Sequence, residues 1–379
     1  MIPSTTRRAA LAILGFALAP LAACAPTSSA HGLTVVATTT QICDYVTQIA
    51  AASTDLSLDK TDASGKSSHV GVAPDNAALT MSLTCLLAPN ASAHEHEMTP
   101  AQTAALADAD VMAVSGVDLE HFLDDAVASS GFHGRMVVTS GVLTASDVDN
   151  PGAADPQTPY TIDRGIERVE VSPWPFPPEN AGEAPEFRFD PHVWTSPKRA
   201  RVQVENLGAG LAAAAPDAAA SINAATASYL EDLDALDAWA TASIETVPEG
   251  QRVLFTSHDA FGYFSGDYGI RFIGAALTDF NDQQDATADH IASAVQAVKD
   301  SGAVALFAEN SNNSKSIEAI ARGAGVTPIV GDDALYGDSL GPDGSAGATY
   351  VGSIIHNVRA VTDAWGGTAP ALPERLAGQ

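Results

Sequence analysis

Residues 33–52, LTVVATTTQICDYVTQIAAA, contain the pattern that decides the fold. The apolar run Leu33–Thr38 is rich in β-branched residues and predicts a buried strand, and Gln41–Ala52 has the spacing of a helix. Another apolar run follows at Leu83–Leu87. Strands that alternate with helices indicate a parallel sheet with crossover helices.

The same alternation continues through the chain. Thr99 and Pro100 predict a capped helix start, because threonine is a good N-cap and proline suits the first helical position. Further apolar runs predict strands at Val111–Val114, Met136–Thr139, Arg252–Thr256, Arg271–Leu277, Ala303–Ala308 and Val326–Val330. We therefore predict an α/β protein with two lobes, each a mainly parallel sheet flanked by helices.

The lobe boundaries follow from this pattern. We expect an N-terminal lobe at 33–195, connecting helices at 196–248 and a C-terminal lobe at 249–379. One connecting helix is predicted from Pro216 to just before Pro248. At about 1.5 Å per residue its length would be ~48 Å, which predicts a rigid spine joining the lobes.

Two segments interrupt the alternation. Residues 53–82 begin with a polar stretch that has no sustained apolar period, which indicates a surface insertion. Residues 147–189 are acidic and rich in proline, with Trp174 near their centre. A long segment of this composition is either functional or poorly ordered. We expect either a loop that covers the functional site or a disordered segment.

The N-terminus has the pattern of an export signal. Arg7 and Arg8 precede an apolar run that is too short to span a bilayer. Leu-Ala-Ala-Cys at 21–24 resembles a bacterial lipobox. We expect a signal peptide at 1–23, lipidation of Cys24, a tether at 24–32, and anchoring at the outer face of the cytoplasmic membrane. Ordinary signal-peptidase cleavage nearby is the alternative.

The charge balance argues against nucleic-acid binding. The formal net charge is −28 at pH 7, whereas contacts with phosphate groups require clustered positive charge.

Two cysteines remain beyond Cys24. Cys43 opens a predicted helix and Cys85 lies in the following strand, and an exported chain meets oxidising conditions. We expect a disulfide between them, with two unpaired buried thiols as the alternative.

Four potential metal ligands each follow a predicted strand: His94, His192, His258 and Asp338. Ligands of open α/β sheets bind at the carboxyl ends of strands, where loops converge. Two of the residues come from each lobe, so a metal between the lobes would hold them together. Three imidazoles and one carboxylate are a zinc donor set.

Five motifs, in order, resemble one family. They are VVATTT at 35–40, AALADADV at 104–111, DPHVW at 190–194, TSHDAFGYF at 256–264 and DSLG at 338–341. The mature chain resembles the zinc and manganese receptors of ABC uptake systems, the cluster A-I solute-binding proteins. The resemblance implies that His192, His258 and Asp338 are metal ligands.

The chain departs from the family pattern around the first ligand. His94 falls on the ligand position and His96 on a family tyrosine; we favour His94 and keep His96 as an accessory candidate. Glu97 and Glu309 are expected either to offset charge from a second shell or to be solvated loop residues. Manganese receptors of the family usually carry a carboxylate where this chain has His258.

We therefore expect an extracytoplasmic receptor that captures Zn²⁺ as transported ligand and delivers it to an ABC permease with its ATPase. A zinc chaperone as loading partner and a monomeric state are further expectations. A manganese-type receptor and a structural or adhesive zinc lipoprotein are the alternatives. An enzyme is not expected, because an HExxH motif is missing and four protein ligands fill a tetrahedral zinc site.

Overall fold

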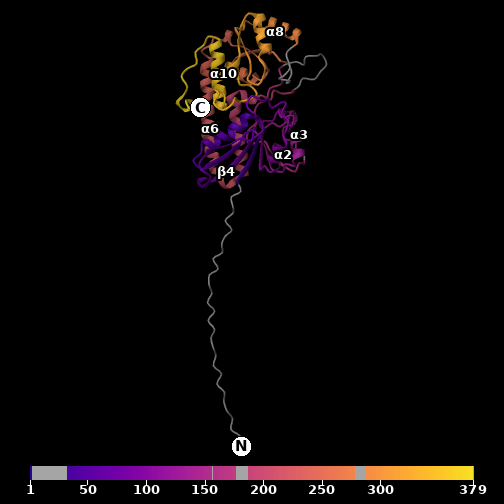
Figure 1. The fold of residues 1–379 in the computed structure, drawn as a ribbon, viewed down its shortest axis with the longest axis vertical. Helices are drawn as coiled ribbons and strands as arrows, with labels where there is room; N and C mark the ends of the chain where they lie inside the picture. The colour runs from indigo at the N-terminus through magenta and orange to yellow at the C-terminus, as the bar shows by residue number, and fades with distance from the viewer. Residues whose placement is uncertain (2–31, 156, 176–186, 278–286, 379) are drawn as a thin grey trace. The chain divides into compact units, whose positions relative to one another are not determined.

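The computed structural model describes residues 1, 32–155, 157–175, 187–277 and 287–378. The predicted signal peptide, the lipidated Cys24 and nearly all of the tether lie outside the described residues. Residues 32–379 form one compact unit. It contains two sheets flanked by helices (Figure 1).

The first sheet has seven strands in the order β3-β2-β4-β1-β5-β6-β7. All neighbouring strands are parallel except β2 and β3. The bounds are β1 Leu33–Ala37, β2 Leu56–Thr61, β3 Ser67–Gly71, β4 Leu79–Cys85, β5 Val111–Val114, β6 Arg135–Val138 and β7 Thr161–Asp163.

The interpretation of residues 53–82 as a surface insertion was wrong. Strand β2 pairs in parallel with β4 and in antiparallel with β3, so this segment extends the sheet. Only the first half of β2 is buried, and β3 is an exposed edge strand. Such strands lack a regular apolar alternation, because their solvated positions accept polar residues.

The second sheet contains four parallel strands in the order β11-β10-β8-β9. Their bounds are β8 Val253–Thr256, β9 Arg271–Ala275, β10 Ala305–Phe307 and β11 Thr327–Ile329. Together the two sheets confirm the predicted α/β fold class.

Ten α-helices lie within the described residues. Their bounds are α1 Thr40–Ala51, α2 Pro100–Ala107, α3 Leu123–Ser130, α4 Ala145–Asp149, α5 Pro197–Ala214, α6 Ala219–Ile244, α7 Gly262–Asp267, α8 Ala288–Ser301, α9 Lys315–Ala324 and α10 Tyr350–Ala364. Thr99 caps α2 with a capping box and Pro100 opens the helix, as the sequence predicts. Helices α2 and α3 lie beside the first sheet, and α8 lies beside the second (Figure 1).

Helix α6 is the predicted spine, and it is shorter than expected. It has 26 residues, or about 39 Å. Residues 216–218 form a separate 3₁₀ turn before it, and it ends at Ile244, earlier than predicted. It packs against α1 of the first lobe, the connecting helix α5 and α10 of the second lobe. One buried cluster, which includes Val36, Leu233 and Phe307, therefore extends through both lobes.

Residues 147–189 contain more regular structure than a loop. Strand β7 adds to the edge of the first sheet beside β6, and Pro173 forms an antiparallel bridge with Phe189. Part of this segment, residues 176–186, lies outside the described residues.

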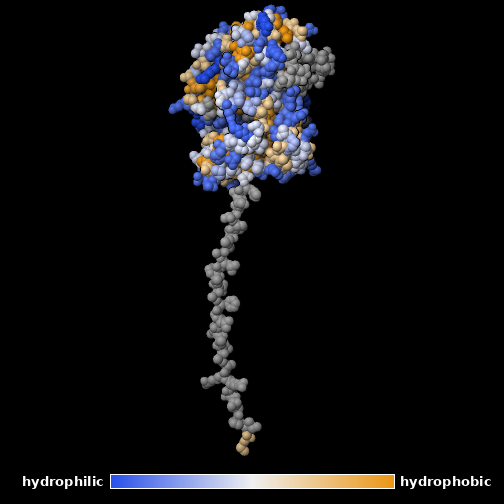
Figure 2. Space-filling model, in the orientation of Figure 1, coloured by the Kyte–Doolittle hydropathy of each residue, from blue (hydrophilic) through white to orange (hydrophobic). Residues whose placement is uncertain are grey.

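The described surface is mainly polar. Hydrophilic residues cover much of the face shown in Figure 2, with apolar residues interspersed. Apart from Met1, Ile166 and Val304 are the large hydrophobic residues that stand exposed among the described ones. Within the same part of the chain, no helix combines the length and the apolar character that a bilayer crossing requires.

Candidate metal centre

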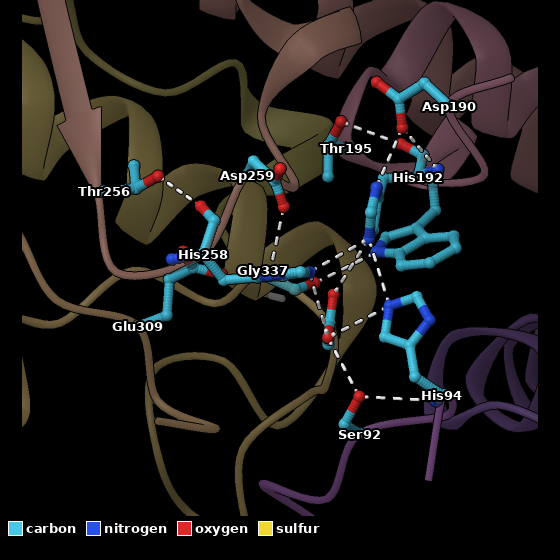
Figure 3. Close-up of polar contacts among 12 residues, drawn as sticks. Ser92, His94, Asp190, His192, Thr195, Thr256, His258, Asp259, Glu309 and Gly337 are labelled. Atoms are coloured by element: carbon cyan, nitrogen blue, oxygen red, sulfur yellow. Dashed lines mark hydrogen bonds and ion pairs between the residues drawn. The ribbon is translucent and has the colours of Figure 1, made fainter. Parts of the chain in front are cut away.

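Four side chains from distant parts of the sequence converge between the two sheets. One ligand atom from each of His94, His192, His258 and Asp338 lies within 4.8 Å of the others. The side chains are almost completely removed from solvent, with exposures of 1% or less. Figure 3 shows His94, His192 and His258 pointing toward one another from separate segments.

The distances between the candidate ligand atoms are short and similar. His192 Nε2 lies 3.1 Å from His94 Nε2 and 3.3 Å from His258 Nε2. The Asp338 carboxylate oxygens lie 3.4 Å from His94, 3.5 Å from His192 and 3.8 Å from His258, measured to each Nε2. All three imidazoles therefore present the same nitrogen to one point.

These distances fit a tetrahedral ion. Zinc bonds to nitrogen or oxygen are about 2.0–2.1 Å long, so neighbouring ligand atoms in a tetrahedron lie about 3.4 Å apart. The observed separations of 3.1–3.8 Å span that value. The residues present thus match a four-coordinate metal without any large rearrangement.

His94 is positioned by the segment that follows β4. The Ser92 hydroxyl donates to Asp338 Oδ2 at 3.0 Å, and it accepts from the backbone N–H of His94 at 3.3 Å (Figure 3). One serine therefore connects a candidate ligand of the first lobe to one of the second.

His192 is oriented by Asp190, two residues earlier. Oδ1 of Asp190 accepts from the backbone N–H of His192 at 3.0 Å and lies 2.8 Å from its Nδ1. A proton held on Nδ1 leaves the Nε2 lone pair for a metal, which is the usual role of a carboxylate beside a ligating histidine. This role of Asp190 was not predicted from the sequence, although the D-P-H spacing is the signal for it.

His258 follows β8 and has two acidic side chains beside it. Glu309 Oε1 accepts from the backbone N–H of His258 at 2.8 Å, and Asp259 Oδ1 lies 3.1 Å from His258 Nδ1. Both acidic groups are buried, and burial raises the pKa of Asp259 to about 8. The donor set would leave a divalent ion with net charge near +1, and nearby carboxylates such as Glu309 can offset that charge.

The backbone around Asp338 accepts hydrogen bonds from two side chains of the first lobe. Gln41, in the first turn of α1, donates from Nε2 to the Asp338 carbonyl at 3.0 Å. The Trp194 indole N–H donates to the Gly337 carbonyl at 2.9 Å. A Cβ at Gly337 would lie 2.0 Å from Glu309 Oε2, so a larger residue there would require the Glu309 carboxylate to move.

Burial and charge set the protonation of the group. Burial lowers the pKa of His94, and it lowers that of His258 to about 3 with help from the other two imidazoles. Burial also opposes the charged form of His192, but Asp190 and Asp338 more than offset it and raise its pKa. Burial alone would raise the pKa of Asp338, yet the three neighbouring imidazoles bring it well below its usual range.

Aromatic rings surround the histidines. The ring centroids of Trp194 and Trp174 lie 5.4 and 5.9 Å from that of His192. The Phe187 centroid lies 5.6 Å from that of His94. Trp174 and Phe187 belong to the described part of residues 147–189, so described residues of this segment lie beside the candidate centre.

The other predicted site residues separate into two groups. His96 lies outside the cluster, with its ring centroid 5.0 Å from that of Phe122. Glu97 is exposed and lines a surface pocket together with His96 and Phe122. Of the two alternatives for the glutamates, Glu97 thus fits a solvated loop residue. Glu309 fits the alternative in which it offsets charge, since it is buried and accepts a hydrogen bond from the backbone N–H of His258.

The expected cysteine pair lies away from this cluster. Cys43 is bonded to Cys85, with the Cα atoms 5.6 Å apart. The bond joins the first turn of α1 to the end of β4.

Comparison with known proteins identifies a family. Residues 72–364 match the family model described as zinc-uptake complex component A periplasmic, ZnuA. The chain is 29% identical over 285 residues to the manganese-binding lipoprotein MntA of Bacillus subtilis, covering 74% of this chain and 82% of the relative. It is 33% identical over 184 residues to the zinc-binding protein TroA of Treponema pallidum, covering 47% and 58%.

Solved structures share the fold. The periplasmic zinc-binding protein TroA from Treponema pallidum superimposes with a TM-score of 0.65 at 23% identity, covering 88% of this chain and 99% of that one. A periplasmic metal-binding protein from candidatus Liberibacter asiaticus gives a TM-score of 0.62 at 17% identity, covering 88% and 99%.

Proposed function

The chain belongs to the zinc-uptake complex component A family, and we propose on that premise that it is an extracytoplasmic receptor for Zn²⁺. It captures the ion with His94, His192, His258 and Asp338 and delivers it to an ABC permease with its ATPase. Anchoring through a lipidated Cys24 is part of this proposal.

The observation that carries the proposal is the convergence of three imidazoles and one carboxylate at tetrahedral spacing. Ligand atoms 3.1–3.8 Å apart suit zinc. His258 and Asp338 come from the second lobe, while His94 and His192 come from loops of the first. Separating the lobes would therefore break the donor set, which gives a receptor a way to release its ion.

Manganese is the second candidate, because the Bacillus subtilis relative is a manganese-binding lipoprotein. Oxygen donors suit manganese, whereas imidazole suits zinc. Three of the four candidate donors here are imidazole nitrogens. The donor set thus favours zinc, although metals bind in vitro largely in order of affinity.

A receptor explains the site better than an enzyme does. Catalytic zinc sites keep an open position for water or substrate and use three protein ligands. This cluster offers four buried ligands. We therefore infer binding and release, with zinc as the transported ligand.

The test is a competitive titration of the purified full chain with zinc and manganese, with metal content measured by mass spectrometry. We expect one zinc per chain, lost or strongly weakened in His258→Ala and in Asp338→Ala. His290→Ala is the matched control, because His290 lies on α8 and its ring contacts the Ala275 carbonyl instead of the cluster. Unchanged zinc binding in both site variants would refute the proposed ligands, and tighter manganese binding would reassign the ion.

Delivery requires a cellular test. A strain that lacks the receptor should regain growth under zinc limitation with the wild-type chain and not with Asp338→Ala. If the wild-type chain bound zinc but gave no rescue and no zinc uptake, a structural or adhesive role would replace transport.

A further inference from the structure

We propose that Trp174 and Phe187 determine metal specificity by excluding water from the metal centre. Their rings favour a four-coordinate ion over one that retains bound water. This inference rests on the proposed function, because it concerns the same ligand set.

The two rings join the imidazoles in one aromatic cluster. Phe187 is 2% exposed, and its centroid lies 5.6 Å from that of His94 and 5.7 Å from that of Trp174. Trp174 in turn lies 5.9 Å from His192. The rings thus contact the two histidines that the first lobe contributes. Neither belongs to a motif that contains a candidate ligand.

Trp174 and Phe187 lie on two short backbone segments that are hydrogen-bonded to each other. The Trp174 N–H donates to the Arg188 carbonyl at 3.1 Å, and the Asp190 N–H donates to the Ser172 carbonyl at 2.9 Å. Asp190 is also the carboxylate that orients His192. The aromatic rings and a candidate ligand are therefore positioned by the same local structure.

Tyr263 of α7, in the second lobe, forms hydrogen bonds with both of these backbone segments. The Tyr263 hydroxyl accepts from the Ser172 N–H at 3.0 Å and donates to the Asp190 carbonyl at 2.8 Å. The Arg199 guanidinium lies 4.4 Å from the Tyr263 ring centroid. Because both lobes hold the pair, the positions of Trp174 and Phe187 depend on the lobes being together.

The chemistry of these rings limits coordination. Phenylalanine has no polar atom, and the tryptophan indole donates a hydrogen bond but offers no metal ligand. Manganese prefers oxygen donors that include water, whereas zinc in a closed site takes four protein ligands. Truncating Phe187 would open space beside polar groups, where a water has partners. That water can then become an additional ligand.

Cobalt(II) is a suitable probe, because tetrahedral cobalt absorbs visible light far more strongly than five- or six-coordinate cobalt. We would titrate cobalt(II) into the purified full chain, and measure zinc and manganese dissociation constants by competition. Phe187→Ala and Trp174→Ala should lose much of the visible absorption. Their preference for zinc over manganese should fall on the order of tenfold, the usual size of effects from residues around a metal site.

Phe122→Ala is the matched control. Phe122 is a partly buried phenylalanine of the same lobe, and its ring packs against His96 outside the cluster. It should keep the wild-type spectrum and metal preference. Phe187→Leu and Trp174→Phe retain apolar bulk and should restore most of both. They also test the inference if the alanine variants do not fold, as judged by thermal unfolding.

The two proposals fail in different ways. If wild-type chain binds no metal, or if His258→Ala leaves binding unchanged, the proposed function fails. If wild-type chain binds zinc through the proposed ligands while folded Phe187→Ala and Trp174→Ala keep the cobalt spectrum and the metal preference, only the water-exclusion inference is overturned.

Discussion

The Nδ1 atom of His192 lies 2.8 Å from Oδ1 of Asp190, and both groups are buried. This contact fixes which imidazole nitrogen faces the proposed metal. It also raises the pKa of His192, although burial acts in the opposite direction. One carboxylate therefore sets both the orientation and the proton affinity of a proposed ligand.

Asp190→Ala should weaken zinc binding by about 10–100-fold, because the imidazole loses the partner that holds its tautomer. Competitive titration measures the effect. Asp234→Ala is the control, since Asp234 is an exposed carboxylate paired with Arg201. Equal affinities for the two variants would show that Asp190 does not orient the ligand.

Zinc affinity should fall as pH decreases through the raised pKa of His192. A ligating imidazole must be neutral, so a proton on Nε2 competes with the metal. His94 and His258 have lowered pKa values and compete only at more acidic pH. Calorimetry in buffers of different ionisation enthalpy should detect release of about one proton per zinc below that pKa. If zinc binding released no proton, His192 would not be protonated in the metal-free chain.

His94→Ala should abolish tight zinc binding, while His96→Ala should leave it nearly unchanged. The His94 Nε2 lies 3.4 Å from Asp338, whereas His96 packs against Phe122 outside the cluster. Isothermal titration of both variants makes the comparison. The reverse result would assign the first ligand to His96.

Loss of the disulfide should destabilise the chain more than it affects metal stoichiometry. Cys43 and Cys85 are separated by 42 residues, and closing such a loop is worth about 4 kcal/mol in the chain-entropy model. A Cys43→Ala, Cys85→Ala double variant should show that loss in urea unfolding and still bind one zinc. Unchanged unfolding would argue against the bond in the exported protein.

Zinc should stabilise the folded chain by mass action. When the free zinc concentration is about 100 times the dissociation constant, the free energy of unfolding should increase by about 2.7 kcal/mol. Thermal unfolding with and without a chelator measures it. Asp338→Ala should show little of this gain, and a full gain in that variant would place the bound zinc elsewhere.

Local sequence patterns predicted most regular elements because their chemistry is local. The apolar run at Leu33–Thr38 became β1, and the Thr99-Pro100 signal became the start of α2. Strand β2 was missed because it is stabilised by pairing with β4 rather than by an apolar pattern of its own. Helix α6 was predicted too long, since the sequence does not separate a 3₁₀ turn from the helix that follows.

The sequence by itself determined the α/β alternation and the choice of donor chemistry, because strand periodicity and imidazole or carboxylate groups belong to single residues and their near neighbours. Only the tertiary structure decided that His94 rather than His96 meets His192, His258 and Asp338. It also decided that Glu309 supports the cluster and that Phe187 covers His94. These relationships join residues up to hundreds of positions apart, and packing of the two lobes brings them within contact distance.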